Sequence, residues 1–418
     1  MEDFRLKAKS ALILGGGIIG LTCALRLQQE AFAVTVVDPY DPPCSATFGN
    51  AGHLAVEQAA PLASPQSLMG AAGRLFAFGG PLDFPLASAA SWGPFVRRFI
   101  AASTPERFAS GKAALSLWLE EAIPAWRRLA AAIGAEDLLY ENGHFIVWES
   151  KKSATKGVSS WKKMNTAASA FRPASEAEIA ELAGRIRAPF AGAVRFERSG
   201  QISDLQELHR RLRLAIENAG GEFIHARAES IENENGKAKA VIAGGARLDA
   251  DIIVVAAGVA SGRLLKSAGC RTPVIAERGY HIEASAEGWP PFPPVVFEDR
   301  SLIITRFANT VRLGGFVEFA SPDAPPDPRK WLRLHQHAAE LGIRLPKPVT
   351  EWMGARPTLP DYLPAIGKSP QASNLLYAFG HQHLGLTLAG ITAEAVARLA
   401  NGRKPELDIA PFDLARFE

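Results

Sequence analysis

Apolar positions near the N-terminus form two short runs joined by a helical pattern. Ala11–Leu14 is apolar, the stretch GGGIIG follows, and apolar residues then recur at helical spacing from Ile18 to about Glu30. The second run, Phe32–Asp38, is rich in β-branched residues and ends in an acid. The pattern therefore predicts a strand, a helix and a second strand at the start of the chain.

Farther along, helical and alternating patterns interleave without an internal repeat. Helices are predicted at Pro105–Ala132, Ser175–Gly184, Asp204–Gly221 and Lys330–Leu341, the second of them opened by a capping box. Strands are predicted at residues 143–149, 222–233, 238–244, 251–261, 279–285 and 302–316, with a tight turn at Asn309. After residue 374 the pattern gives a strand, a glycine turn and a helix that ends at Asn401–Gly402. Mixed elements of this kind indicate an α/β protein.

Composition and charge change this picture little. The chain has 418 residues, of which 47% are hydrophobic and 21% charged, and its formal net charge is +3. This length predicts two domains, and the composition is that of an ordinary globular protein without a nucleic-acid module. The basic run Lys151–Lys163 is interpreted as a solvated loop, with contact to an acidic surface as the alternative.

Cysteine usage and the first residues bear on the compartment. Cys23, Cys44 and Cys270 are far apart and form neither a CxxC pair nor a disulfide framework, which fits a reducing compartment. The opening stretch MEDFRLKAKS lacks the apolar segment of a signal peptide, and the first apolar run is broken by glycines. We therefore expect a cytoplasmic protein.

The glycine-rich turn predicts a dinucleotide site. Gly15, Gly17 and Gly20 form a GxGxxG pattern between a predicted strand and helix. Gly15 permits the tight turn, Gly17 lets the backbone approach a pyrophosphate, and Gly20 lets helix and strand pack closely. Asp38 ends the next strand at the expected offset of about 20 residues, where it can bind a ribose and would repel the 2′-phosphate of NADP. The alternative is a glycine turn with a purely structural role.

Later segments favour FAD over a nicotinamide cofactor. A nicotinamide enzyme usually completes a contiguous doubly wound sheet, whereas here a long irregular stretch follows the first unit. A second strand able to approach a nucleotide appears only at Ile252–Gly258, and a third strand–turn–helix at Gly380. This scattering suits a long dinucleotide held by segments from the whole chain.

Several stretches together resemble the FAD-dependent D-amino-acid oxidase superfamily, most closely its D-amino acid dehydrogenase branch. They follow the order of the family and cover nearly the whole chain: LILGGGIIGLTCAL with VTVVD, SATFGNAGHLA, DIIVVAAG, RGYHIE, ITRFANTVRLGGFVEF, GARPTLPDYLPAIG and LLYAFGHQHLGLTLAG. The resemblance implies a Rossmann-like FAD-binding domain with an inserted α+β substrate domain that contains an antiparallel sheet. The expected FAD-binding domain comprises residues 1–90, 165–275 and 350–418, and the expected substrate domain comprises residues 91–164 and 276–349.

The resemblance also implies which residues contact FAD. The loop after the second strand would wrap the pyrophosphate and flavin through Ser45, Asn50, Ala51, Gly52 and His53. The adenosine would be approached by Ala256, Ala257 and Gly258, and its adenine by the backbone near Glu229. Two helix starts complete the expected set, with Ile18, Ile19, Gly380, Leu384, Gly385, Leu386 and Thr387. At the second of these starts, backbone N–H groups and the positive helix end would face the N1/O2 edge of the flavin, where reduced flavin carries negative charge.

The expected reaction moves hydride from an amino-acid Cα to flavin N5, so the protein must anchor the substrate carboxylate. Arg356, in GARPTLPD, is the predicted anchor, because a guanidinium binds a carboxylate bidentately and this arginine has that role in the resembling oxidases. Tyr280 is a predicted second contact, with a place in the core as the alternative. Arg306 is predicted to face either the flavin or solvent.

The histidines of FGHQHLG are interpreted separately. His383 falls where some relatives have a second substrate-binding arginine, so a weaker substrate contact is predicted, whereas His381 is predicted to hold the turn. No metal site is expected, since neither histidine has a matching carboxylate or cysteine cluster. His335 and His337 would point about 200° apart on a helix and cannot chelate together. Cys44 is interpreted as a loop cysteine rather than a covalent flavin tether.

Substrate and electron acceptor stay open at this level. The motifs FGNAGH and GHQHLGLTLAG resemble those of D-hydroxyproline dehydrogenases, which implies a cyclic amine such as D-proline or cis-4-hydroxy-D-proline. The segment Leu75–Ile100 resembles the region by which dehydrogenase relatives touch the membrane and reach a quinone; its alternative is packing on the substrate domain. Two other functions remain: a glycine- or sarcosine-type oxidase that releases hydrogen peroxide, and a flavin-binding subunit without turnover.

Overall fold

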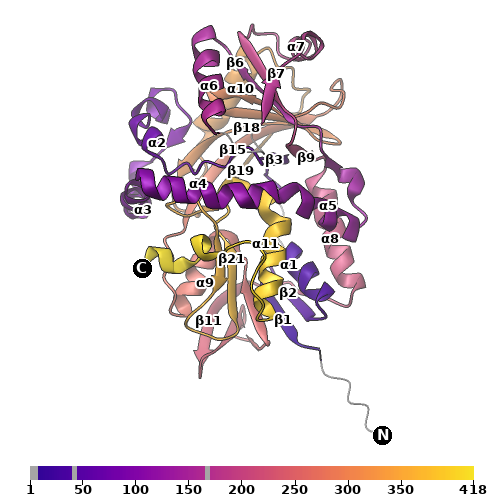
Figure 1. The fold of residues 1–418 in the computed structure, drawn as a ribbon, viewed down its shortest axis with the longest axis vertical. Helices are drawn as coiled ribbons and strands as arrows, with labels where there is room; N and C mark the ends of the chain where they lie inside the picture. The colour runs from indigo at the N-terminus through magenta and orange to yellow at the C-terminus, as the bar shows by residue number, and fades with distance from the viewer. Residues whose placement is uncertain (1–7, 40–44, 165–169) are drawn as a thin grey trace.

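Two large β-sheets organise the protein, whose computed structural model describes residues 8–39, 45–164 and 170–418. A six-stranded sheet lies in the lower half of Figure 1 and a nine-stranded sheet in the upper half. Helices α4 (Pro105–Glu120) and α5 (Ala122–Ala132) run across the boundary between the two halves. The mixed α/β fold that the sequence predicts is confirmed.

The six-stranded sheet is parallel except at one edge. Its strands, in spatial order, are β10 (Glu222–Ile224), β2 (Ala33–Val37), β1 (Ser10–Leu14), β14 (Ile252–Val255), β21 (Leu375–Phe379) and β20 (Ala365–Lys368). Only β20 is antiparallel to its neighbour. The central strands are short apolar runs because both faces of a parallel sheet are buried.

Each face of this sheet has its own cover. One face packs on α1 (Ile18–Gln29), α8 (Leu205–Asn218) and α11 (Gly385–Ala400), with α4 and α5 outside them. The other face packs on α9 (Ser261–Ser267) and the small sheet of β11 (Ala228–Glu234), β12 (Lys237–Ile242) and β13 (Arg247–Leu248). The sheet thus lies between two apolar layers, as a doubly wound fold requires.

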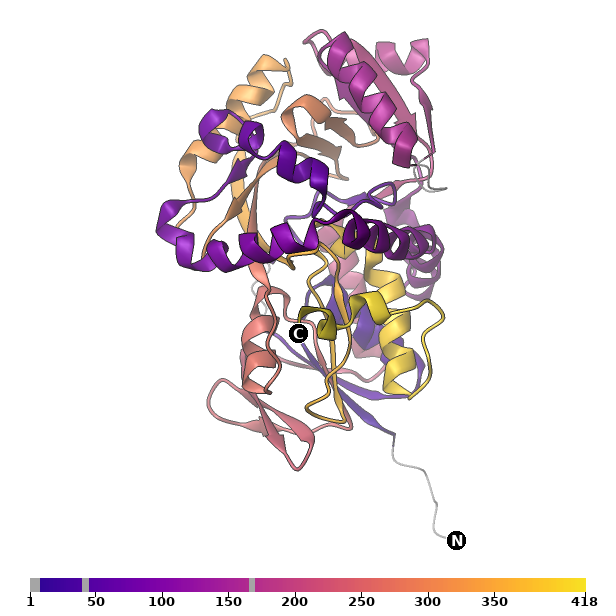
Figure 2. The same ribbon diagram turned by 60° about the vertical axis from the view of Figure 1, so that its left-hand side comes forward.

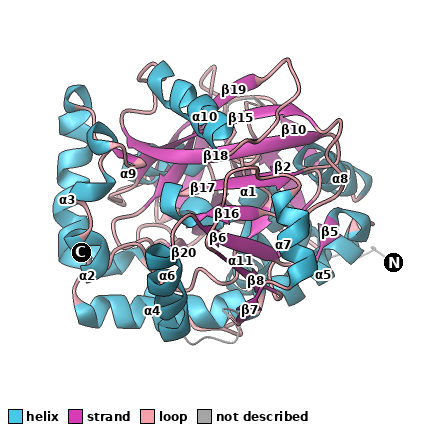
Figure 3. Ribbon diagram, turned by 90° about the horizontal axis from the view of Figure 1, so that it is seen from above, coloured by secondary structure: helices cyan, strands magenta, loops and turns pink. Residues whose placement is uncertain are grey.

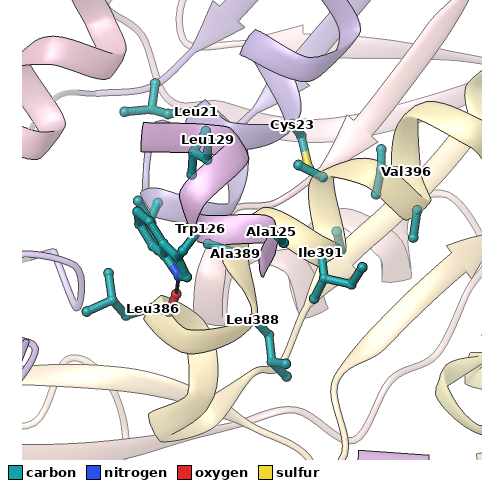
Figure 4. Close-up of a cluster of buried hydrophobic side chains, with 14 of the residues drawn as sticks. Leu21, Cys23, Ala125, Trp126, Leu129, Leu386, Leu388, Ala389, Ile391 and Val396 are labelled. Atoms are coloured by element: carbon teal, nitrogen blue, oxygen red, sulfur yellow. Dashed lines mark hydrogen bonds between the residues drawn. The ribbon is translucent and has the colours of Figure 1, made fainter. Parts of the chain in front are cut away.

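Helices α5, α1 and α11 meet in a buried cluster shown in Figure 4. Trp126 of α5 is fully buried, and its indole Nε1 donates a hydrogen bond to the Leu386 carbonyl at 2.9 Å. Gly390 of α11 faces Ala125, and a Cβ at residue 390 would come within 3.1 Å of the α5 backbone. Helix α5 therefore fixes the start of α11 by close packing and by one directed bond.

The upper sheet is mostly antiparallel, and Figure 3 shows its strands side by side. Their order is β19 (Thr350–Thr358), β15 (Ile275–Ser285), β18 (Thr310–Phe319), β17 (Leu302–Arg306), β16 (Val295–Phe297), β6 (His144–Trp148), β8 (Gly192–Phe196) and β7 (Phe171–Pro173), with β4 (Leu82–Asp83) paired to β18. Helix α10 (Pro328–Glu340) packs on β15 and β18. The tight turn expected at Asn309 is confirmed, since β17 and β18 flank it.

Smaller elements surround the upper sheet. Strands β3 (His53–Leu54), β9 (Gly200–Ile202) and β5 (Leu139–Tyr140) form a second three-stranded sheet. Helices α2 (Pro65–Met69) and α3 (Ala89–Ala102) lie along one side of the upper half, as Figure 2 shows. Helix α7 (Glu176–Ala183) begins with the predicted capping box of Ser175 and Glu178. Across the described ranges, no helix has both the length and the apolarity to span a bilayer.

Two predicted elements are wrong. The run Lys151–Lys163 is not a loop but most of helix α6 (Lys151–Met164), because Trp161 anchors it to β6 and β8. The single helix expected over Pro105–Ala132 is divided at Glu121 into α4 and α5, both of which contact α11.

The expected domain boundaries stay a prediction, and sheet membership differs from them in places. Strands β7, β8 and β19 belong to the upper sheet, although their residues were assigned to the FAD-binding domain. Helices α4 and α5 were assigned to the substrate domain, yet they share the core of the lower sheet.

Candidate active site

A cavity of about 1010 Å³ runs between the two sheets. Its wall begins at the turn after β1, follows the loop after β2, and ends at β15, β19 and the start of α11. Sites for small ligands usually measure about 300–1,000 Å³, so this cavity suits a large ligand or two ligands together.

The turn after β1 has no room for side chains where it crosses β14. Gly15 has φ +116°, and a Cβ there would lie 2.4 Å from the Ala256 carbonyl oxygen. A Cβ on Gly20 would lie 1.8 Å from the Gly15 carbonyl oxygen. Gly17 differs, because a Cβ there would meet only Thr47 Oγ1, at 3.4 Å, and Gly17 borders the cavity. The backbone of this turn is therefore open to a ligand.

Three side chains from distant segments hold the turn. Asp38 Oδ2 accepts a hydrogen bond from the Gly16 N–H at 2.7 Å, and Thr47 Oγ1 accepts from the Ile18 N–H at 3.0 Å. His209 of α8 lies with Nε2 3.2 Å from the Gly16 carbonyl, to which it donates. The sequence indicated Asp38 but neither Thr47 nor His209, because both reach the turn only through tertiary packing.

Arg312 of β18 holds the loop after β2. Its guanidinium donates to the carbonyls of Phe48 and Asn50, and it pairs with Glu283 of β15. Gly49 lies against the ring of Trp352, where a Cβ would approach within 1.9 Å. The loop Ser45–His53 is thus pressed onto the upper sheet while its own residues face the cavity.

Most predicted cofactor residues border the cavity. These are Gly15, Gly17, Ile18, Ile19, Asp38, Ser45, Asn50, Ala51, His53, Ala257, Gly258, Gly385 and Leu386. Gly258 has φ +57° and nothing within 4 Å of an added Cβ, so the backbone after β14 also faces open space. Their roles toward a cofactor stay a prediction, and Cys44 lies outside the described residues.

Other predicted cofactor residues do not border the cavity. They are Gly20, Gly52, Glu229, Gly380, Leu384 and Thr387. Thr387 Oγ1 accepts from the Ala55 N–H at 2.9 Å, and Leu384 packs in the core. Glu229 is exposed, whereas the preceding Arg227 and Ala228 border the cavity.

Arg356 is held by a buried carboxylate. Its Nη1 lies 3.1 Å from Glu277 Oε1, and the two residues are paired neighbours on β19 and β15. Glu277 is 2% exposed, and its Oε2 accepts from the hydroxyls of Thr358 and Tyr362, both at 3.0 Å. The guanidinium lies over Gly279, where a Cβ would come within 2.4 Å of Nη2. One part of the Arg356 side chain is therefore anchored by Glu277. The side chain as a whole is 31% exposed and borders the cavity.

The predicted substrate contact of Tyr280 stays a prediction, and the contacts of its hydroxyl favour the alternative that the sequence left open. Tyr280 borders the cavity, but its hydroxyl donates to Glu318 Oε2 at 2.7 Å and accepts from Arg278 and the Asp327 N–H. Strand alternation separates Tyr280 from Glu277 and Gly279, so its hydroxyl points away from Arg356. The alternative, a place in the core, agrees with its packing among buried apolar residues.

The two histidines after β21 are both neutral; His381 is buried, and His383 is partly buried. His383 borders the cavity, and burial lowers its pKa to about 4. His381 Nε2 lies 3.0 Å from Thr392 Oγ1 of α11, and burial lowers its pKa to about 3. His381 thus ties the turn to the helix, as predicted. Arg306 donates to the carbonyls of Trp289 and Ala308 and does not border the cavity.

Sequence reasoning missed the group that supports Arg356. Glu277 is an acid inside an apolar strand run, which signals a buried partner, and Tyr362 lies in a motif already noted. Tyr362 has φ +57°, and burial raises the pKa of its hydroxyl well above the usual value. The spacing of residues 277, 356 and 362 along the chain does not indicate that their side chains lie together in the fold.

Comparisons with known proteins place the chain among flavoenzymes. A family model described as FAD dependent oxidoreductase matches residues 10–399. A D-amino-acid oxidase from Bradyrhizobium diazoefficiens is 27% identical over 421 residues, covering 98% of this chain and 99% of that protein.

Solved structures share the fold. A glycine oxidase from Geobacillus kaustophilus superposes with a TM-score of 0.73 at 19% identity, over 98% of this chain and 99% of its own. An iminodiacetate oxidase from Chelativorans sp. BNC1 gives 0.72 at 18% identity, over 97% and 98% of the two chains. An L-proline dehydrogenase from P. horikoshii gives 0.71 at 16% identity, over 98% of each chain.

Proposed function

Because the chain belongs to the FAD-dependent oxidoreductase family, we propose that it is a D-amino acid dehydrogenase that opens the Cα–H bond of its substrate. FAD is its cofactor, and the reaction class is the oxidation of an amine or amino acid. The observation that supports the proposal is Arg356, exposed to the cavity yet oriented by buried Glu277.

The residues present fit FAD. The turn at Gly15–Gly17 and the backbone at Gly258 both face the cavity without side chains, as close approach of a pyrophosphate and a nucleoside requires. The carboxylate of Asp38, directly after β2, borders the cavity and would accept a hydrogen bond from a ribose hydroxyl. When bound, FAD supplies the hydride acceptor.

Arg356 would bind the substrate carboxylate. A guanidinium gives two parallel N–H donors, and one edge of Arg356 is already fixed by Glu277. Fixing the cation in advance lowers the entropy lost on binding, so the carboxylate is held in one orientation. Gly279 leaves the space for the guanidinium, and any larger residue there would displace it.

His383 would contact the substrate as a neutral group. Its low pKa leaves an imidazole with one donor and one acceptor near neutral pH. Such a group can donate to a carboxylate or accept from an amine without adding a second charge. Arg356 therefore remains the cation that selects the carboxylate.

The start of α11 favours negative charge on the cavity side. Gly385 and Leu386 begin this helix and border the cavity. A helix N-terminus carries about half a positive charge, so an anion beside it is stabilised without a charged side chain. This supports the expected contact with the edge of a reduced flavin.

For substrate we propose a D-amino acid, with D-proline and cis-4-hydroxy-D-proline as the first candidates. The named relatives include a D-amino-acid oxidase and an L-proline dehydrogenase, so acyclic and cyclic amines both belong in the test. The proposed acceptor is a membrane quinone, with the protein cytoplasmic and peripheral at the bilayer.

Anaerobic reduction of the bound flavin tests the proposal. The flavin absorbance is followed while D-, L- and N-methyl amino acids are added in turn, and air or a dye is then admitted. Bleaching by D-amino acids and rapid reoxidation by dye alone are expected. Bleaching only by glycine or sarcosine, with peroxide formed in air, would favour an oxidase; no bleaching by any of them would favour a flavin-binding subunit.

A further inference from the structure

Two histidines and a glutamate converge in a buried cluster at the edge of the cavity. His53 on β3, Glu57 just after it and His144 on β6 are 8%, 1% and 0% exposed. His53 Nε2 lies 3.1 Å from Glu57 Oε1, and His144 Nε2 lies 3.8 Å from the same oxygen. The two imidazole rings are 4.4 Å apart.

The outer nitrogen of each ring is fixed by β9 and the residue before it. His53 Nδ1 lies 3.2 Å from the Gly200 carbonyl, and His144 Nδ1 lies 2.6 Å from Ser199 Oγ. A carbonyl only accepts, so His53 Nδ1 carries the proton, and in the neutral ring Nε2 is then a bare lone pair. Histidines that bind metals are held in this way, by an outer hydrogen bond that turns the other nitrogen inward.

Two inner atoms of the cluster lack a partner among the described residues. Glu57 Oε2 and His144 Nε2 are buried without a hydrogen-bond partner, and Gln58 reaches only Oε1, at 3.4 Å. Unpaired buried groups of this kind are costly, so a ligand that bonds to them would stabilise the cluster.

A second cluster, of three carboxylates, is neutralised by a lysine side chain of the protein. Asp83, Glu318 and Asp327 converge in the upper domain, and Lys330 Nζ lies 2.6, 3.0 and 2.9 Å from them. Among the described residues, no lysine or arginine makes an ion pair with Glu57.

We propose that His53, Glu57 and His144 bind one divalent transition-metal cation of the zinc type, with a fourth coordination position toward the cavity. Two imidazole nitrogens and one carboxylate are a recognised ligand set for zinc, with bonds of about 2.0–2.2 Å. Tetrahedral ligands at that distance stand about 3.3 Å apart, between the 3.1 and 3.8 Å separations observed here. His53 and Glu57 border the cavity, which provides the entry path.

A single proton is the competing occupant. Placed on His53 Nε2, it would satisfy the 3.1 Å contact but leave His144 Nε2 and Glu57 Oε2 unpaired. A divalent cation bound by Glu57 Oε1 and both Nε2 atoms also pairs His144 Nε2, so it leaves one of these atoms unpaired where the proton leaves two. The count of unpaired atoms therefore favours the metal.

Metal binding is measured on the untagged holoenzyme, independently of turnover. The protein is treated with a chelator, its metal-to-flavin ratio is determined by elemental analysis, and Zn²⁺ is added in competition with a chromophoric chelator. One Zn²⁺ per chain is expected. Glu57→Gln and His144→Gln should each weaken binding at least tenfold, and Ser199→Ala by about 10- to 100-fold, since it removes an outer hydrogen bond.

The matched control is His335→Gln, which removes a half-exposed histidine that pairs with Glu351 outside the cluster. It should bind Zn²⁺ as the unmodified protein does. Ser199→Ala keeps all three ligands, so it reports on the site even if a ligand variant fails to fold. The proposal is overturned if the unmodified protein takes up no Zn²⁺ at micromolar concentration, the result expected for a proton, or if all variants bind equally.

Discussion

Arg356 and Glu277 make a prepared anion site out of two residues that are 79 positions apart. Pairing with Glu277 offsets part of the positive charge of Arg356 but fixes the orientation of the guanidinium. The hydroxyls of Thr358 and Tyr362 in turn hold the Glu277 carboxylate in place. The arrangement predicts that geometry, as well as charge, is essential at residue 356.

Arg356→Ala should raise KM for the amino acid by about 100-fold or more, because loss of a charge-assisted bidentate pair costs about 3 kcal/mol. Arg356→Lys keeps the charge but only one point of contact, so an intermediate rise is expected. Steady-state kinetics with the best substrate from the bleaching test checks both. Arg306→Lys, outside the cavity wall, is the control and should leave KM unchanged; an equal KM in all variants would remove Arg356 from the site.

Single residues were predictable where one type alone fits the task. Spacing pointed to Gly15, Gly17 and Asp38, and the chemistry of carboxylate binding together with the family resemblance pointed to Arg356; all four border the cavity, and their roles stay predictions. Glu277 could not be assigned in the same way, because its role depends on a neighbouring strand that the sequence does not identify. The face of the upper sheet on which the Tyr280 hydroxyl lies could not be assigned either, because it depends on strand register.

At the level of elements, strand β18 and the loop after β2 depend on each other. Arg312 reaches from the strand to two carbonyls of the loop, and Glu283 holds the guanidinium from β15. The loop has few hydrogen bonds of its own, apart from short turns such as that of Asn50 with the Gly52 N–H. The shape of this part of the cavity is therefore set by the upper sheet.

Arg312→Met should loosen the loop and weaken FAD binding at least tenfold, because two partly buried carbonyls and one carboxylate lose their donor. The fluorescence of flavin released on dilution measures the dissociation constant. Arg300→Met removes an arginine that pairs with Glu149 and does not border the cavity, and it should not change that constant. Equal flavin release from both variants would contradict the role given to Arg312.

Elements were predictable from local pattern when the pattern was strong. The first strand, the first helix and α8 with its Asp204 cap appear close to their expected bounds. The chain's break at Glu121 and the helix at Lys151–Met164 were missed, since each is decided by what the segment packs against. Local helix propensity does not determine which part of the fold a segment packs against.

For the molecule as a whole, buried histidines set a limit on acid stability. His381 and His383 are neutral in the folded chain, with pKa values of about 3 and about 4, against about 6.5 when unfolded. Below pH 6.5 the unfolded chain therefore binds more protons than the folded one, and stability falls as pH falls toward 4.

Between pH 7 and pH 5 each of these histidines should cost about 2 kcal/mol of unfolding free energy. His381→Asn removes one titrating group, so its own loss over this range should be smaller than that of the unmodified protein by about that amount. Denaturant unfolding at both pH values measures the difference, with His335→Gln as the exposed control. Identical pH dependence in the three proteins would contradict the prediction.

The segment from α2 to α3, residues 65–102, exposes apolar and basic side chains on the surface. Phe84 and Phe95 stack on Phe319 of β18, so its inner face packs on the upper sheet. Its outer face leaves Met69, Phe78, Leu86 and Ile100 exposed by 80%, 75%, 85% and 53%. Arg97 and Arg98 are exposed there, and Asp83 is bound to Lys330. Such a surface suits the headgroup layer of an anionic bilayer.

The exchange of Phe78 and Leu86 for serine should weaken binding to vesicles of phosphatidylcholine with phosphatidylglycerol by at least about tenfold, because two exposed apolar side chains are lost. Cosedimentation measures the bound fraction. Leu332→Ser, at a site 60% exposed on α10, is the control. Equal binding by both variants would contradict membrane contact through this segment.

The strand order of the lower sheet determines when each part of that sheet can form during translation. Strand β1 leaves the ribosome first, but its neighbour β14 starts at residue 252, and β21, the next strand, ends at residue 379. The cavity gains its last wall only when α11, from residue 385, has emerged. Strand β1 can pair early with β2 on one edge, but its other edge stays unpaired until β14 has emerged, and the flavin cannot be enclosed until nearly the end of translation. Chaperone demand, rather than cofactor supply, should therefore limit the yield of active protein.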